Sequence, residues 1–139
     1  MKYYLGIDIG STKTDALIAD ENGNRIGTGQ GGPGNHETVE FDGMEKAMRE
    51  ALNGSLFNAK IQIGQMIDAG FGIGGYDWPS EEPHMQTTIN KLGLTGPYKI
   101  VNDAVLGLLA ATSEGWGVAV VSGRGCNCRG KAVLQVIVF

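Results

Sequence analysis

The chain has 139 residues, 42% of them apolar and 19% charged, a composition typical of one globular domain with a sizeable core. Its formal net charge of -4 argues against nucleic acid or an anionic membrane as the main partner, since both attract basic surfaces. The sequence contains no run of about 18 apolar residues, the length that a membrane span needs, and its two cysteines exclude a disulfide framework, so we expect a cytoplasmic protein.

The beginning of the chain is predicted to form three consecutive antiparallel strands. Tyr3 to Ile9 and Thr14 to Ala19 are apolar strands joined by a short polar turn. The following segment, Asp20 to Asn24, contains Asn-Gly, which is the strongest short hairpin signal. Arg25 to Gln30 then forms the third strand.

Helices and strands alternate in the rest of the chain. Apolar residues recur at helical spacing from about Val39 to Leu52. Asp77 as a cap and Pro79 in the first turn predict a second helix, which ends near Gly93. The remaining predicted elements are a strand from Gln62 to Phe71, a strand from Lys99 to Asn102, an apolar helix from Ala104 to Thr112, a strand from Gly117 to Ser122 and a glycine loop from Gly123 to Gly130. The order βββαβαβα, followed by one extra strand and a loop, predicts a mixed sheet with helices on its faces rather than a Rossmann domain.

The strongest functional signal is the hairpin from Leu5 to Asp20, which contains GIDIGSTKTD. Asp8 stands at the end of a buried strand, where a carboxylate is costly unless it meets a cation or hydrogen-bond donors. The turn that follows offers successive backbone N–H groups and the hydroxyls of Ser11 and Thr12. We therefore predict a grip on a Mg²⁺-bound phosphate, with Asp8 facing the waters of the metal. An ordinary hairpin with a polar turn is the alternative.

Two further segments carry candidate chemistry. The loop from Ser122 to Gly130 (SGRGCNCRG) follows an apolar strand, so it is either a second phosphate loop facing the first or a surface turn. Asn102 and Asp103 end a strand and open an apolar helix, whose N-terminus favours the anion. Asp103 is therefore a candidate to accept a proton from a substrate hydroxyl, or to orient it. A plain helix cap is the alternative.

Three other patterns are decoys. Gly27 to Gly32 fits G-x-G-x-x-G, but a proline loop follows where a dinucleotide fingerprint needs a helix. Gly125 to Lys131 fits most of a P-loop, but Ala132 stands where Ser or Thr is required. Cys126 and Cys128 are too few for a zinc or iron–sulfur site within one chain.

Taken together, these segments resemble the actin-like ATPase superfamily, and within it the BadF/BadG/BcrA/BcrD ATPase family, which includes N-acetylglucosamine kinases. The matching stretches are GIDIGSTKTDALIAD, GGPGNH, DAGFGIGG, VNDA and VAVVSGRGCNCRG, in that order over residues 3–130. The resemblance implies an RNase H-like α/β fold, a mixed five-stranded sheet with helices on both faces. It also implies ATP and Mg²⁺ as cofactors, and transfer of the γ-phosphoryl group to a sugar hydroxyl.

The resemblance also implies roles for single residues. Those implied to contact the ATP phosphates are Asp8, Gly10, Ser11, Thr12 and Lys13 in the first motif, with Asp8 reaching Mg²⁺ through water, and Gly123, Arg124 and Gly125 in the second. Those implied to lie at the amino sugar are Asn35, His36, Cys126 and Asn127, with Asp103 as the catalytic carboxylate beside the acceptor hydroxyl.

The chain departs from the family pattern in two places. Arg124 replaces a threonine, and it either pairs with a phosphate or blocks the loop. After Gly130, KAVLQVIVF differs from the polar continuation of the family, which carries a second domain with the adenosine site. We therefore expect residues 1–115 to form an N-terminal domain and residues 116–139 to begin a truncated second domain. Such a chain would be a natural fragment, a frameshifted product or a shortened version, with little or no turnover alone.

Two other functions stay open. ATPases that activate acyl-CoA reductases or dehydratases belong to the same family, but they hold an iron–sulfur cluster between subunits, whereas Cys126 and Cys128 lie in the phosphate loop. The chain could instead be a non-catalytic module. Its terminal strand VLQVIVF favours association, so we expect a homodimer or a larger assembly.

Overall fold

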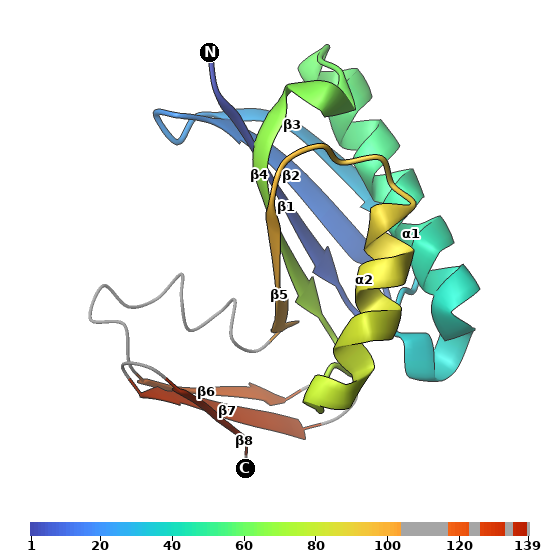
Figure 1. The fold of residues 1–139 in the computed structure, drawn as a ribbon, viewed down its shortest axis with the longest axis vertical. Coiled ribbons are helices and arrows are strands. Elements are labelled where there is room, and N and C mark those ends of the chain that lie inside the picture. The colour runs from blue at the N-terminus through green and yellow to red at the C-terminus, as the bar shows by residue number, and fades with distance from the viewer. Residues whose placement is uncertain (104–116, 123–125, 133–134, 139) are drawn as a thin grey trace.

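The computed structural model describes residues 1–103, 117–122, 126–132 and 135–138, the last three segments as backbone only (Figure 1). A five-stranded sheet with the order β3-β2-β1-β4-β5 organises the first 103 residues. Its strands are β1 (Tyr3–Ile9), β2 (Thr14–Asp20), β3 (Arg25–Gly31), β4 (Met66–Ile73) and β5 (Tyr98–Asn102). Strands β1 to β3 pair antiparallel, whereas β4 pairs parallel with both β1 and β5. The predicted mixed sheet is confirmed.

One face of this sheet forms the core. In β1 the side chains of Leu5, Ile7 and Ile9 are buried, while Tyr4 and Asp8 on the alternate positions are exposed, as the period of a strand dictates. The helices α1 (His36–Ala59) and α2 (Glu82–Asn90) share a single hydrophobic cluster with the buried strand residues. Both helices therefore cover the same face of the sheet (Figure 1). The helix predicted from Ala104 to Thr112, which would cover the other face, lies outside the described residues.

Helix α1 rests on β3 through glycines. A Cβ atom added to Gly27, Gly29 or Gly31 would overlap the backbone of α1, so only glycine allows the helix to approach this closely. The G-x-G-x-x-G pattern over Gly27 to Gly32 is thus explained by helix–strand packing, in line with its rejection as a dinucleotide motif.

Helix α1 begins earlier than predicted. Asn35 caps it, because the side-chain oxygen accepts a hydrogen bond of 3.0 Å from the Glu37 N–H. The backbone leaves the helical region at Glu40, with φ 61° and ψ 178°, and this break separates a first turn from the regular helix. The predicted start at Val39 was wrong because this short turn precedes the periodic part of the helix. The end at Leu52 was also wrong, since α1 continues to Ala59 and is capped by Lys60.

Two 3₁₀ turns change other predicted boundaries. The turn η1 (Ile63–Gln65) is closed by the Gln62 N–H and the Gln65 side chain at 2.7 Å, so β4 starts only at Met66. The turn η2 (Pro79–Glu81) precedes α2. The strand predicted to end at Phe71 continues to Ile73, because Gly72 still pairs with both neighbouring strands.

The end of the chain forms a separate antiparallel sheet. Its strands are β6 (Gly117–Ser122), β7 (Cys126–Ala132) and β8 (Gln135–Val138), in the order β6-β7-β8. The predicted loop from Gly123 to Gly130 was wrong in its extent, since β7 pairs with β6 from Cys126 onward. Three strands thus stand where a first strand, a loop and a terminal strand were expected. Among the described helices, none has the length and apolar character that crossing a bilayer requires.

Candidate functional site

The turn between β1 and β2 is closed by its own backbone. The Gly10 N–H donates to the Lys13 carbonyl oxygen at 2.9 Å, and a Cβ at Gly10 would lie only 3.0 Å from that oxygen. Ser11, Thr12 and Lys13 are exposed. These three residues are therefore open to solvent, and their predicted contact with phosphate stays a prediction.

Asp8 lies directly before this turn, in a negative environment. Its cross-strand neighbour is Asp15, whose carboxylate pairs with the Lys13 ammonium group at 3.2 Å. Partial burial, and then the negative charges of Asp103 and Asp15, raise the pKa of the Asp8 carboxyl, although Lys13 opposes this. A cation would relieve the repulsion, and carboxylate oxygens are the ligands that Mg²⁺ prefers. The residues present therefore fit a hydrated Mg²⁺ ion at Asp8.

The loop that leads into α1 is bound to the same strand end. The Gly34 N–H donates to the Gly10 carbonyl oxygen at 3.0 Å, and the buried Thr14 hydroxyl donates to the Gly32 carbonyl oxygen at 2.9 Å. A Cβ at Gly34 would lie 2.6 Å from the Ile9 side chain. These contacts hold Asn35 beside the end of β1.

The turn after β4 joins the remaining parts. The Gly74 N–H donates to the Ile9 carbonyl oxygen at 2.8 Å, and a Cβ at Gly74 would lie 3.3 Å from the Asp103 carboxylate. A Cβ on the next residue, Gly75, would lie 2.6 Å from the Asn35 side-chain oxygen. Asn35 and Asp103 therefore flank one glycine turn, at the carboxyl ends of the parallel strands β1, β4 and β5, where such sheets place chemistry.

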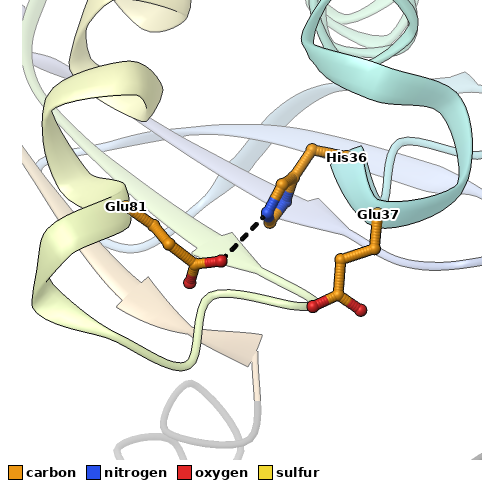
Figure 2. Close-up of side chains that lie close together, drawn as sticks. All are labelled: His36, Glu37 and Glu81. Carbon is orange, nitrogen blue, oxygen red and sulfur yellow. Dashed lines mark hydrogen bonds and ion pairs between the residues drawn. The ribbon is translucent and has the colours of Figure 1, made fainter.

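His36 occupies a different position from Asn35. Its side chain is only 8% exposed, and the Nε2 atom lies 3.3 Å from Oε1 of Glu81 (Figure 2). The ring also stacks on Phe41, with the ring centroids 4.9 Å apart, while Nδ1 is buried without a hydrogen-bond partner among the described residues. The imidazole thus connects the first turn of α1 to η2.

Glu81 was missed by the sequence analysis. Its other oxygen, Oε2, accepts hydrogen bonds from the N–H groups of Asp77 at 2.9 Å and Trp78 at 3.2 Å. Partial burial alone would raise the pKa of Glu81, but these two donors and His36 outweigh it and lower the pKa. Its position three residues after Trp78 is the one from which a glutamate binds back to a helix start, but its contact with His36, 45 residues away, has no local signal. Gly74 and Gly75 lie within DAGFGIGG, one of the stretches that resemble the family, but neither was predicted to be a site residue.

The structure describes no side chain of the second predicted phosphate motif. Gly123, Arg124 and Gly125 lie outside the described residues, and Cys126 and Asn127 belong to β7, which is described as backbone only. Their predicted roles stay predictions. Of the predicted site residues, the structure brings together Asp8, Gly10, Asn35 and Asp103.

Comparisons with known sequences match the chain to one family and to two kinases. The model of the BadF/BadG/BcrA/BcrD ATPase family matches residues 5–131. The chain is 26% identical over 131 residues to an N-acetylmuramic acid/N-acetylglucosamine kinase from Clostridium acetobutylicum, covering 94% of the chain and 43% of that protein. It is also 26% identical over 135 residues to an N-acetyl-D-glucosamine kinase from Dictyostelium discoideum, covering 88% of the chain and 41% of that protein.

A solved structure is similar over nearly the whole chain. A ROK family glucokinase from Streptomyces griseus, in complex with glucose and AMPPNP, superposes with a TM-score of 0.68 at 22% identity, covering 97% of the chain and 46% of the kinase. This likeness confirms the predicted fold of actin-like sugar kinases. The chain spans less than half the length of each of these three relatives.

Proposed function

Because the chain belongs to the BadF/BadG/BcrA/BcrD ATPase family, we propose that it carries the phosphate grip and part of the sugar site of an amino-sugar kinase. The reaction of such an enzyme is transfer of the γ-phosphoryl group of Mg·ATP to a hydroxyl of N-acetylglucosamine or a related sugar. Support comes from the two N-acetylglucosamine kinases that the chain resembles over 94% and 88% of its length.

The observation that carries the proposal is the convergence of three segments around one glycine turn. The Gly74 N–H binds the carbonyl oxygen of Ile9, the residue after Asp8 at the end of β1, while Asn35 and Asp103 flank the same turn. A phosphate-binding turn, an amide and a carboxylate at one sheet edge form the set that phosphoryl transfer to a hydroxyl needs.

The phosphates of ATP would bind the turn between β1 and β2. Ser11 and Thr12, which carry hydroxyls, are exposed there, and the Lys13 ammonium group adds a positive charge. Asp8 would hold Mg²⁺ through water, and the ion when bound neutralises phosphate charge. Burial, and then the charges of Asp103 and Asp15, raise the pKa of the Asp8 carboxyl, and a bound cation would favour its anion.

The acceptor sugar would bind between Asn35 and Asp103. The Asn35 side-chain amide offers both a donor and an acceptor to sugar hydroxyl or acetamido groups. The Asp103 carboxylate would accept the proton of the attacking hydroxyl, or orient that hydroxyl for in-line transfer.

Binding to the chain tests the proposal without requiring turnover. Titration of ¹⁵N-labelled protein with Mg·ADP should shift the amides of residues 10–13, and N-acetylglucosamine should shift those of Asn35 and Gly75. Asp8→Asn should abolish the Mg²⁺-dependent shifts, whereas Asp42→Asn, which removes an exposed charge on α1, should not. Absence of both sets of shifts at millimolar ligand would refute the proposed function.

We also propose a domain boundary near residue 115 and self-association of the chain. The boundary is supported by the separation of the β1–β5 and β6–β8 strands into two sheets. Strand β8 lies at an edge of the second sheet, and an unpaired edge is a template for another strand. Light scattering should detect a dimer or larger species, and a monomer across the micromolar range would refute self-association.

A further inference from the structure

The carboxylate of Glu81 binds two segments at once. Oε2 accepts hydrogen bonds from the Asp77 and Trp78 N–H groups, and Oε1 accepts from Nε2 of His36 at 3.3 Å when that nitrogen carries the proton. Figure 2 shows the two side chains pointing toward each other from α1 and η2. The Glu81 side chain is 24% exposed and that of His36 is 8% exposed, so solvent screens this contact only in part.

On one side, the contact reaches the proposed sugar residue. His36 follows Asn35 directly, and Asn35 forms the cap of α1 through the N–H groups of Glu37, Thr38 and Val39. A displacement of His36 would therefore displace the Asn35 side chain, whose oxygen lies 2.6 Å from where a Cβ on Gly75 would stand.

On the other side, the contact reaches the strand end that carries Asp103. The buried Asn102 side chain donates to the Tyr76 carbonyl oxygen at 2.9 Å, in the turn whose next two N–H groups bind Glu81. The same turn places Gly74 against the Asp103 carboxylate. One short turn, residues 74–78, thus lies beside both proposed sugar-binding residues, Asn35 and Asp103.

We propose that Glu81 is a positioning residue of the sugar site, which acts through His36 and the 74–78 turn to fix the distance between Asn35 and Asp103. This inference rests on the proposed function, since it assigns a cause to the geometry of the proposed sugar site. Glu81 itself makes no contact with residues 10–13 among the described residues, although the turn that it holds binds the Ile9 carbonyl oxygen through the Gly74 N–H. Its removal should therefore weaken sugar binding more than nucleotide binding.

The test compares sugar and nucleotide affinities in matched variants. Glu81→Ala should weaken N-acetylglucosamine binding about ten-fold or more, the loss expected for a hydrogen bond to a charged group, and change the Mg·ADP affinity less than about two-fold. Glu81→Gln should restore most of the sugar affinity, because its amide can accept from the two N–H groups and donate to His36. Glu45→Ala, which removes ion pairs with Arg49 on α1 and with Lys91 after α2, is the control and should leave both affinities unchanged.

A double-mutant cycle tests whether Glu81 acts through His36. His36→Leu keeps an apolar side chain against Phe41 but removes the contact with Glu81. If the link is as proposed, the double variant His36→Leu/Glu81→Ala binds sugar no more weakly than the worse single variant. Should Glu81→Ala fail to fold, Glu81→Asp replaces it, since the shorter side chain keeps the charge but not the reach to His36.

The outcomes distinguish a failure of the proposed function from a failure of the proposed role of Glu81. If the wild-type chain binds no sugar, the proposed function fails and this inference fails with it. If wild type and Glu81→Ala bind sugar equally, or if the cycle is additive, the inference alone is overturned. His36, Glu37 and Glu81 also place ligand atoms within 4.8 Å of one another, so a sugar affinity that EDTA lowers and Zn²⁺ restores would overturn the hydrogen-bonded role in favour of a metal site.

Discussion

The negative charge of Asp103 acts on Asp8: after partial burial, it is the next cause of the raised pKa of the Asp8 carboxyl. The two residues come from different strands, Asp8 from β1 and Asp103 from the end of β5, with β4 between them. A free anion at Asp8 is therefore disfavoured in the folded chain. A carboxyl at a strand end whose pKa is raised by burial and by neighbouring carboxylates is typical of a functional site.

Asp8→Asn should raise the free energy of unfolding at pH 7, because it removes this disfavoured anion. The folded-state pKa of Asp8 lies above its unfolded value, so its protonation favours the fold at low pH, and this contribution is lost as the pH rises through the folded pKa. The advantage of the variant should thus shrink as the pH falls toward about 4, near the usual pKa of aspartate. Urea unfolding at the two pH values checks this.

The control for this prediction is Asp42→Asn, which removes an exposed carboxylate from α1. It should leave the free energy of unfolding unchanged at both pH values. An equal gain in both variants would mean that lowering the net charge, and not the site at Asp8, stabilises the chain.

Gly29→Ala should destabilise the fold by about 3 kcal/mol or more, at the upper end for overpacking. The added Cβ would overlap the Ala51 carbonyl oxygen and the Ser55 backbone nitrogen, which are backbone atoms that cannot rotate away. At Gly32, just after the same strand, a Cβ would meet no atom of the described residues within 4 Å. Gly32→Ala should therefore change the stability by less than about 0.5 kcal/mol. Similar losses in urea unfolding would contradict the packing explanation.

The first three strands and the sheet edge of the site were predictable because their signals are local. Two apolar segments and the Asn-Gly turn predicted β1 to β3, and the positions of Asp8 and Asp103 at strand ends marked them as candidates. Two kinds of feature were not predictable. The start of α1 was missed because the break at Glu40 interrupts the periodicity, and Glu81 was missed because its contact with His36 depends on how α1 and η2 meet in three dimensions.

Glu40→Gly should stabilise the chain, although glycine within a helix normally costs stability. The backbone of Glu40, at φ 61° and ψ 178°, lies in a region that is almost reserved for glycine and costs about 1–3 kcal/mol for other residues. Relief of this strain should outweigh the entropy of glycine in the unfolded chain, roughly 0.5–1 kcal/mol. The free energy of unfolding in urea should rise by about 1 kcal/mol.

Lys46→Gly is the matched control on the same helix. Lys46 is exposed and lies in the regular part of α1, so glycine there should cost about 1 kcal/mol. Opposite signs for the two variants are expected. A loss at both positions would mean that the backbone of Glu40 is not strained in solution.

Thr14→Val should loosen the loop that carries Asn35 while leaving the shape of the core almost unchanged. Thr14 is fully buried, and its hydroxyl donates to the Gly32 carbonyl oxygen at 2.9 Å. Valine fills the same volume but leaves that acceptor without its donor, which should cost about 1–2 kcal/mol. Hydrogen exchange should accelerate at the Gly34 N–H, which binds the Gly10 carbonyl oxygen. Thr28→Val, on an exposed position of β3, should change neither quantity, and unaltered exchange at Gly34 in Thr14→Val would show that the hydroxyl does not hold the loop.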